Sequence, residues 1–245
     1  MAKNKRGKFT RSRKPITWRQ KLFRYFLVVI LYFVTATSAL VFLLSFVNPP
    51  TTPLMWIRWI EDGYPVQHTL VLKNWQPLKK ISPNLILAAI TAEDSRFFKH
   101  RGVDWRAAWA AFRHNINSSQ KYGASTITMQ TARNVFLWQK RNWFRKSLEI
   151  YFTLLMEFLW TKQRILEVYL NVIEWGNGIY GCDEAARAYY HRPPSKLSPI
   201  EAVRMVSILP NPRVWNLESL PKDVIRRQSR IMEETKFTWV PHIRK

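Results

Sequence analysis

Residues 81–102 read ISPNLILAAITAEDSRFFKHRG, and this stretch leads a predicted helix directly into a cluster of polar side chains. Ser82 and Pro83 form a common helix start, an N-cap residue followed by proline in the first turn. Small and apolar residues then recur at spacings of three and four, the period of a helix that is buried along one face. They are Leu85, Ala88, Ala89 and Ala92. The pattern predicts an apolar helix that ends at Glu93.

Two adjacent acids, Glu93 and Asp94, follow that helix and lie close in sequence to two phenylalanines and His100. A carboxylate set against aromatic surface is desolvated, which raises its pKa and makes it a stronger base than a solvated carboxylate. A helix C-terminal turn with solvated acids is compatible with the same residues. The segment taken alone leaves both interpretations open.

The sequence beyond this cluster is also mostly helical in pattern. Helices are expected over residues 104–112, 125–136, 142–160, 162–172 and 198 to about 209. The last of these opens with Ser-Pro-Ile-Glu, the capping-box arrangement with proline at the first helical position. The one candidate strand is residues 67–72. We therefore predict a mainly α domain over residues 60–245.

The N-terminal part of the chain predicts a transmembrane anchor. Residues 25–47 contain no charge and would form a helix about 34 Å long, against a bilayer core of about 30 Å. This stretch is longer than the apolar region of a signal peptide and lacks the polar face of a soluble core helix. Ten lysines and arginines lie in the tail, residues 1–24, so we expect the N-terminus in the cytoplasm. Residues 48–59, rich in proline, are expected to be a stiff extended linker.

The charge balance narrows the class of partner. The whole chain carries a formal charge of +23, and residues 48–245 alone carry +13. Such a charge suits nucleic acid, anionic lipid head groups or phosphate-bearing substrates, and export across a membrane argues against nucleic acid. The histidines are scattered without a metal-ligand spacing, so a divalent cation is not indicated and no cofactor is required. Cys182, the single cysteine, is expected to be a small buried apolar residue.

Two further segments combine cations with hydroxyls or with a carboxylate. Residues 123–134, GASTITMQTARN, place a glycine before a hydroxyl-rich helix start, and helix N-termini of this kind bind anions well. Residues 145–149, RKSLE, place two cations and an acid within about one helical turn. The simpler alternatives are helix capping by Ser125 and Thr126, and a surface salt bridge between Arg145 and Glu149.

Taken in order, these segments resemble the motifs of the peptidoglycan glycosyltransferases, the polymerases of bacterial cell-wall glycan. Residues 93–102 resemble the family's E-D-x-x-F-x-x-H-x-G, residues 123–134 its G-x-S-T-I-x-Q-Q-x-x-K-N, and residues 145–149 its R-K-x-x-E. Residues 162–171 resemble K-x-x-I-L-E-x-Y-L-N, and residues 176–190 resemble a glycine-rich segment followed by A-A-x-x-Y-F. Five motifs in one order make the resemblance highly specific.

The resemblance implies a lysozyme-like fold and assigns roles to individual residues. Glu93 would take the proton of the attacking hydroxyl, and Glu149, the second catalytic acid, would position the acceptor or orient the cations. The implied substrate-binding residues are Ser125, Thr126, Gln130, Arg133, Arg145 and Lys146, of which the three cations would bind the leaving diphosphate. The implied supporting residues are Asp94, Phe97, His100 and Gly102.

The reaction implied by the resemblance is polymerisation of glycan strands. The 4-hydroxyl of a lipid-linked disaccharide, lipid II, would attack C1 of the growing lipid-diphosphate-linked chain with inversion. The implied partners are lipid II, the growing strand and the lipids of the cell inner membrane, with division or elongation proteins as further candidates and no nucleic acid. The domain would be periplasmic. Neither Ser-Asp-Asn nor Lys-Thr-Gly occurs, so no transpeptidase activity is expected.

Two positions depart from the family pattern. Met129 stands where the family usually has glutamine, which leaves its role in substrate binding open. Arg133 replaces a lysine, keeps the charge and adds bidentate phosphate geometry.

Two other functions compete with synthesis. A murein hydrolase or lytic transglycosylase of lysozyme-like fold would need an acid at the glycosidic oxygen but no cations for a diphosphate, so Arg133 and Arg145 favour synthesis. A non-enzymatic membrane-tethered adaptor would need neither Glu93 nor Glu149. The aromatic residues Trp105, Trp109 and Phe112 predict either a face at the membrane interface or ordinary core packing.

Overall fold

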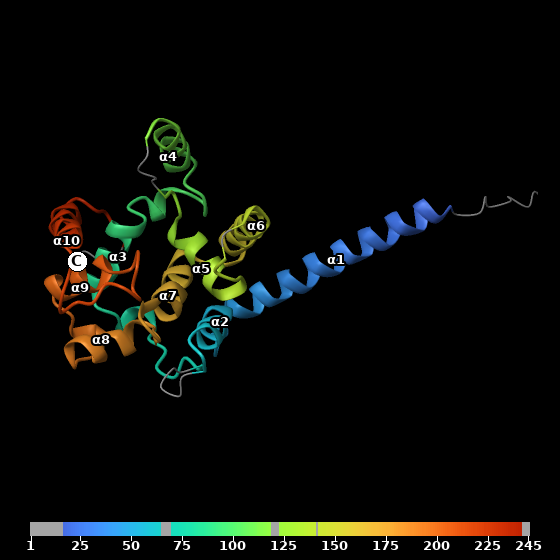
Figure 1. Ribbon diagram of the computed structural model, residues 1–245. Helices are drawn as coiled ribbons and strands as arrows, with labels where there is room; N and C mark the ends of the chain where they lie inside the picture. The colour runs from blue at the N-terminus through green and yellow to red at the C-terminus, as the bar shows by residue number, and fades with distance from the viewer. Residues whose placement is uncertain (1–16, 65–69, 119–122, 141, 242–245) are drawn as a thin grey trace, which may run out of the picture. The chain divides into compact units, whose positions relative to one another are not determined.

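The computed structural model describes residues 17–64, 70–118, 123–140 and 142–241 (Figure 1). Within these ranges the chain is mainly α-helical, as the sequence predicted, with ten α-helices, three short 3-10 helices and one two-stranded antiparallel sheet. The described residues form two compact units, one that ends at Leu40 and one that begins at Val41. The second unit carries all the predicted site residues.

Helix α1, Trp18–Leu44, contains most of the predicted membrane span. Its large apolar side chains are mostly exposed up to Leu40, and only Val41 and Leu44 are buried. It is the one helix within the described ranges that is long and apolar enough to cross a membrane. Its last turn belongs to the second unit, where Val41 lies in the main hydrophobic cluster and its carbonyl accepts a 2.7 Å hydrogen bond from Trp160 Nε1.

The segment after α1 differs from the extended linker that the sequence predicted for residues 48–59. Helix α2, Pro53–Glu61, begins within it, with Pro53 in the first turn and the Thr52 hydroxyl accepting a hydrogen bond from the Met55 amide. Proline disrupts a helix interior but suits a first turn, since its missing N–H has no helical partner there. Burial of Leu54 and Met55 then stabilises the helix.

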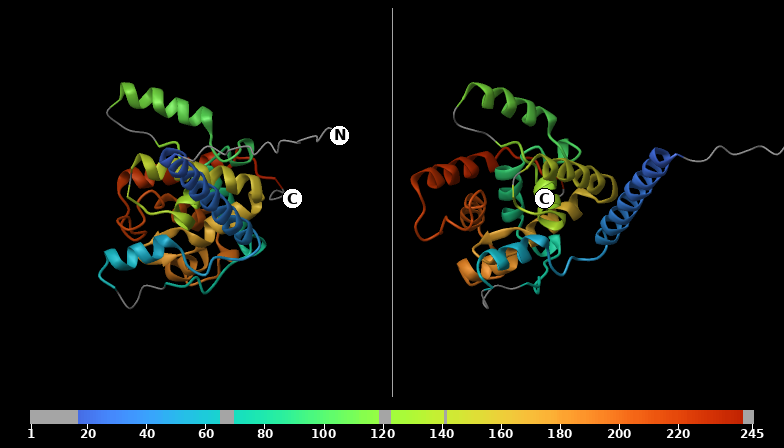
Figure 2. Two further views of the ribbon diagram at one scale, coloured as in Figure 1. Left: turned by 90° about the vertical axis from the view of Figure 1, so that its right-hand side faces the viewer. Right: turned by 45° about the vertical axis from the view of Figure 1, so that its right-hand side comes forward.

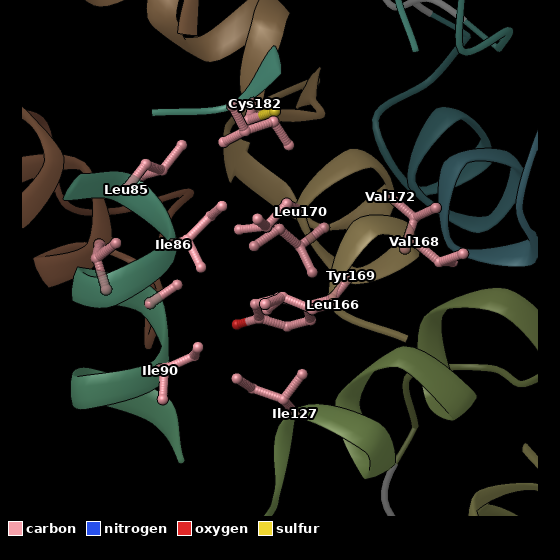
Figure 3. Packing of buried hydrophobic residues seen from close by; sticks show 14 of the residues in the cluster. Leu85, Ile86, Ile90, Ile127, Leu166, Val168, Tyr169, Leu170, Val172 and Cys182 are labelled. Carbon is pink, nitrogen blue, oxygen red and sulfur yellow. The ribbon is translucent and has the colours of Figure 1, made fainter. Parts of the chain in front are cut away.

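The core of the second unit is built around α7, Lys162–Val172, where apolar side chains are buried on several sides. Figure 3 shows Leu85, Ile86 and Ile90 of α3, Pro83–Glu93, facing Leu166 and Leu170 of α7. Helix α5, Ile127–Phe136, packs against α7 and against α6, Trp143–Leu159. Helix α9, Pro199–Ser207, packs against α3. The ends of α3, α5 and α6, which carry the predicted site residues, are thereby fixed to one core.

The remaining elements complete the second unit. They are the 3-10 helices η1 (Leu78–Lys80), η2 (Phe97–Lys99) and η3 (Pro194–Lys196), helices α8 (Cys182–Tyr190) and α10 (Lys222–Thr235), and strands β1 (Glu174–Gly176) and β2 (Ile179–Tyr180). Cys182 is fully buried, as predicted. The candidate strand at residues 67–72 is wrong for its described part, because residues 70–72 form no strand, while residues 67–69 lie outside the described residues. The sheet lies instead at β1 and β2, which are too short to show an alternating pattern.

Helix α4, Trp105–Asn117, contributes no buried residue to the core. Figures 1 and 2 show it standing apart from the other helices of the second unit. Trp105 is 68% exposed, and Trp109 and Phe112 are exposed as well. Ordinary core packing is therefore wrong for these three aromatics, and a role at a membrane interface stays a prediction.

Candidate active site

Glu93 is the last residue of α3, and its side chain is only 12% exposed. Gln130 Nε2 on α5 donates a 2.9 Å hydrogen bond to one carboxylate oxygen, and Arg227 Nη2 on α10 lies 2.7 Å from the other. Burial raises the pKa of the Glu93 carboxyl, and the nearby charges of Arg227 and Arg133 and the Gln130 hydrogen bond only partly oppose this. A solvated acid at a helix end, the alternative that the sequence left open, is therefore wrong.

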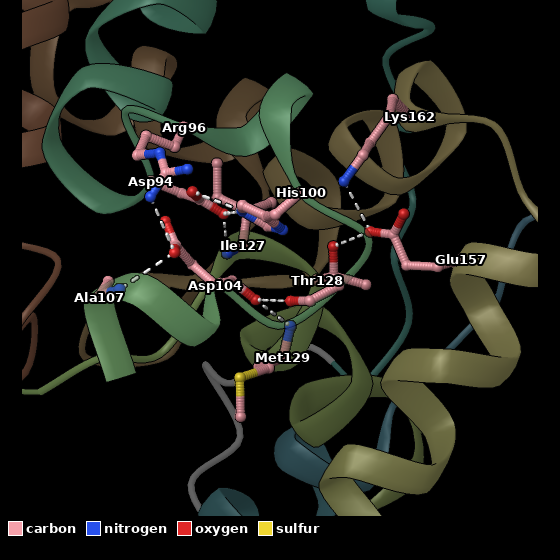
Figure 4. Close-up of polar contacts among 12 residues, drawn as sticks. Asp94, Arg96, His100, Asp104, Ala107, Ile127, Thr128, Met129, Glu157 and Lys162 are labelled. Atoms are coloured by element: carbon pink, nitrogen blue, oxygen red, sulfur yellow. Dashed lines mark hydrogen bonds and ion pairs between the residues drawn. The ribbon is translucent and has the colours of Figure 1, made fainter. Parts of the chain in front are cut away.

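Asp94 and His100 link the end of α3 to the start of α5. His100 Nε2 lies 2.9 and 3.0 Å from the two oxygens of the Asp94 carboxylate, which also accepts a 3.1 Å hydrogen bond from the Ile127 amide (Figure 4). Phe97 is fully buried, with the Lys162 ammonium 4.4 Å above its ring. These contacts fix Asp94 and His100 between the end of α3 and the start of α5, and Phe97 in the core; their supporting role at the site stays a prediction.

Gly102 allows the chain after η2 to pack closely against α6. Its φ is +83°, and a Cβ at this position would lie 2.6 Å from Thr153 Cγ2. Its carbonyl accepts a hydrogen bond from the Thr126 hydroxyl. Only glycine tolerates both the positive φ and the close approach to Thr153 without strain.

The hydroxyls before α5 have different surroundings. Thr126 is buried and is the N-cap of α5, since its hydroxyl accepts a 3.2 Å hydrogen bond from the Met129 amide. The buried Ser125 Oγ has no hydrogen-bond partner among the described residues. Ser125 and Glu93 line the same cavity of about 220 Å³. The capping alternative thus suits Thr126, whereas Ser125 offers a hydroxyl next to the acid.

A second cavity of about 300 Å³ is lined by two of the three predicted cations. Arg133 of α5 and Arg145 of α6 both line it, together with Gln130 and Tyr169. Because Gln130 also donates to Glu93, it joins this cavity to the one that Glu93 lines. Glu93 and the guanidinium groups of Arg133 and Arg145 therefore lie at adjoining cavities.

Glu149 is held between the two cations of its own helix. Its side chain is 1% exposed, contacts the Arg145 guanidinium directly and lies 2.7 Å from Lys146 Nζ. Arg145 Nε also donates a 3.1 Å hydrogen bond to the Lys140 carbonyl. A surface salt bridge is therefore wrong for Arg145 and Glu149, because both side chains are buried. Lys146, at 38% exposed, is the more accessible of these two cations.

Comparison with known proteins identifies the family. Residues 64–236 match the family model described as Transglycosylase. The chain belongs to this transglycosylase family. Its lysozyme-like helical fold and its glycosyltransferase activity in peptidoglycan synthesis follow from that membership.

The curated relatives cover most of this transglycosylase. Biosynthetic peptidoglycan transglycosylases from Bdellovibrio bacteriovorus and Caulobacter vibrioides are 43% and 42% identical to it over 213 and 217 residues. These alignments cover 87% and 89% of this chain and 85% and 92% of the relatives. The relative from Rhodospirillum centenum is 47% identical over 187 residues, 76% of this chain and 78% of the relative. Helix α1 of the transglycosylase fits single-pass membrane anchoring.

Met129, one of the two departures from the family pattern, is 3% exposed. Its side chain is therefore packed inside the transglycosylase, and it is not among the residues that line the two described cavities of the site. Arg133, the other departure, lines the second cavity.

Three charged residues of the transglycosylase site were not predicted from the sequence. Arg227 contacts Glu93, while Arg58 of α2 and Glu174 of β1 line the second cavity, with Arg58 Nε 3.3 Å from a Glu174 carboxylate oxygen. Burial raises the pKa of the Glu174 carboxyl, and Arg58 opposes this. None of the three lies in a segment whose pattern predicted chemistry. The described ranges contain no group of three or more His, Cys, Asp or Glu side chains that could hold a metal ion.

Proposed function

We propose that this transglycosylase polymerises glycan strands from lipid II, with Glu93 as the general base. The observation that carries the proposal is a buried carboxylate joined through Gln130 to a cavity lined by Arg133 and Arg145. Glycosyl transfer from a diphosphate needs these two components, a proton acceptor for the nucleophile and cations for the leaving group.

Glu93 has the surroundings of a base. Each carboxylate oxygen has two acceptor sites, so the hydrogen bonds from Gln130 and Arg227 leave capacity for a sugar hydroxyl. Because burial raises the pKa of Glu93, it accepts a proton more readily than a solvated carboxylate. In the proposed step the 4-hydroxyl oxygen of lipid II bonds to C1 of the donor, its proton passes to Glu93, and the bond from C1 to the diphosphate breaks with inversion.

Arg133 and Arg145 would bind the departing diphosphate, on which negative charge builds up as that bond breaks. Lys146, more exposed, would add a third charge. Ser125, Thr126 and Gln130 would line the donor side. Glu149 contacts both Arg145 and Lys146 and is not among the residues that line the two described cavities. Its role in this proposal is to orient the cations rather than to touch the acceptor.

The chain organisation follows the sequence prediction in this proposal. Residues 1–24 form a cytoplasmic tail and residues 25–47 the inner-membrane span, and the periplasmic domain predicted at 60–245 is extended to include α2, which begins within the connection predicted at 48–59. The basic residues before the span favour this orientation. A protease added outside spheroplasts should cleave the domain and leave the tail protected.

The function is tested with two substrates. The purified full-length protein in detergent is incubated either with lipid II or with finished murein sacculi, and the products are separated by size. We expect lipid-linked glycan polymer from lipid II and no soluble fragments from sacculi. Soluble fragments from sacculi without polymer from lipid II would assign a hydrolase or lytic enzyme, and no product from either would assign an adaptor.

A further inference from the structure

Helix α10 brings an arginine to the acid that the proposed function uses as base. Val224 and Ile231 are buried and fix α10 against the core, where it packs on α3 and α9. Arg227, between them, is 19% exposed at its side chain. Its Nη2 lies 2.7 Å from Glu93 Oε1 and 3.4 Å from the Ala92 carbonyl oxygen. The guanidinium thus contacts both the carboxylate and the last turn of the helix that carries it.

We propose that Arg227 is a positioning residue, which fixes the Glu93 carboxylate and keeps it in the ionised form that a base requires. This inference rests on the proposed function. Arg227 engages one carboxylate oxygen from α10, and Gln130 engages the other from α5. A carboxylate bonded from two different helices keeps one orientation, and a base must hold its acceptor oxygen within hydrogen-bond reach of the proton that it removes.

Among the groups around Glu93, Arg227 opposes most strongly the rise in pKa that burial causes. Arg133 of α5 also faces the acid, Asp94 follows it in the chain, and the Tyr169 phenol of α7 lies nearby. Burial raises the pKa of Glu93, and Arg227 lowers it more than Gln130 or Arg133 does, while Asp94 raises it. Without Arg227 the pKa of Glu93 rises further. More of the protein then carries a protonated acid that cannot act as base.

The test compares variants of the full-length protein. Arg227→Gln removes the charge. Arg227→Lys keeps the charge but replaces the guanidinium with a compact ammonium group. Arg226→Gln is the matched control, since Arg226 is the neighbouring residue, is 80% exposed at its side chain and lies 3.6 Å from Asp223, which is exposed as well. Initial rates of polymerisation of lipid II are measured from acidic to alkaline pH, with kcat and KM separated and thermal unfolding recorded.

We expect Arg227→Gln to move the acidic limb of the rate profile to higher pH. A displacement of about one pH unit corresponds to an about tenfold lower kcat below the limb. The loss should shrink at alkaline pH, where Glu93 is ionised in both proteins, and KM should stay unchanged. Arg227→Lys should show a smaller displacement, and Arg226→Gln none.

Three results would overturn the proposal. A uniform loss with an unchanged limb would make Arg227 a purely structural contact, and a higher KM with unchanged kcat would place it on the substrate. Wild-type behaviour of Arg227→Gln would leave it no role at the site. If Arg227→Gln fails to fold, the limb of Arg227→Lys decides, since an unmoved limb there rejects the proposal. Failure of the proposed function is seen separately, because either the wild-type protein would then make no polymer from lipid II or Glu93→Gln would polymerise normally.

Discussion

Glu93 and Glu149 are both largely buried acids next to arginines, yet their surroundings differ. Glu93 lines a cavity and contacts one cation and one amide. Glu149 contacts two cations of its own helix and is absent from the lining of both described cavities of the site. An acid with access to a cavity can accept a proton from substrate, whereas an enclosed acid between two cations fixes their positions. Residue type and helix position do not separate these roles, but the surroundings do.

The largest expected effect is that of Glu93→Gln. The amide keeps the shape and accepts the Arg227 hydrogen bond through its one oxygen, but its nitrogen accepts neither the Gln130 hydrogen bond nor a proton, and a positioned base contributes about 10² to 10⁴ in rate. Polymerisation of lipid II should fall by that range while thermal unfolding stays close to wild type. Glu234→Gln, a change at an exposed acid of α10, is the control. A rate near wild type for Glu93→Gln would remove the distinction between the two acids.

Arg145→Ala should have the next largest effect. Arg145 is buried and lines the second cavity, and loss of one group that stabilises transition-state charge costs about 10² to 10³ in kcat. Lys146→Ala should cost less, because Lys146 is more exposed and is not among the residues lining that cavity. The two rates are compared at saturating lipid II. Equal losses would count against a specific role for Arg145.

Glu149→Gln should reduce the rate more modestly than Glu93→Gln. Glutamine can still accept a hydrogen bond from Arg145, but the charge-assisted contacts are lost, and a loss of about 1–2 kcal/mol corresponds to about tenfold in rate. The acidic limb of the rate profile should stay in place, since Glu149 is not the proposed proton acceptor. A limb that moved in this variant would assign Glu149 to the proton transfer.

The smallest effect on the rate is expected for Gly102→Ala. This variant tests the packing between the segment that follows Glu93 and helix α6, which carries Glu149. Gly102 packs against Thr153 of α6, and the Thr153 hydroxyl donates to the Glu149 carbonyl. A left-handed conformation and a 2.6 Å clash should lower the free energy of unfolding by about 1–3 kcal/mol, measured by denaturant titration. Gly123→Ala is the matched control, because a Cβ there meets no atom within 4 Å. Equal stability of the two variants would show that Gly102 does not limit this packing.

The sequence predicted those helices that begin at a capping residue recognisable in the local sequence. Ser82, Asn142 and Ser198 cap α3, α6 and α9 through their own side chains, so their starts agree with the prediction within one or two residues. Helix α10 follows Pro221 without a side-chain cap, and α2 begins at a proline that the sequence analysis took as a helix breaker. The stability of α10 comes from packing against α3 and α9, which a local pattern does not contain, whereas α2 has a local start, the Thr52 cap and Pro53, that the sequence prediction missed.

The candidate site was predictable to the extent that it lies in contiguous motifs. Glu93, Gln130, Arg133 and Arg145 come from such motifs, and the structure brings them into adjoining cavities. The contact between Arg227 and Glu93 joins residues 134 positions apart, and α10 has the polar surface of an ordinary amphipathic helix. The sequence also left two roles open for Glu149, positioning the acceptor or orienting the cations. The choice proposed between them rests on the contacts of Glu149 in the structure, which the spacing of Arg145 and Glu149 does not give.

Helix α2 shows that the functional unit extends beyond the segment shared with the family model. The match begins at residue 64, whereas Leu54 and Arg58 of α2 line the cavity that holds Arg133 and Arg145. A shortened protein that starts at the family boundary would lack one wall of that cavity and would leave Glu174 without its Arg58 partner. A piece of this chain produced for crystallisation or inhibitor screening therefore has to include α2, and it keeps the whole second unit only if it begins at Val41.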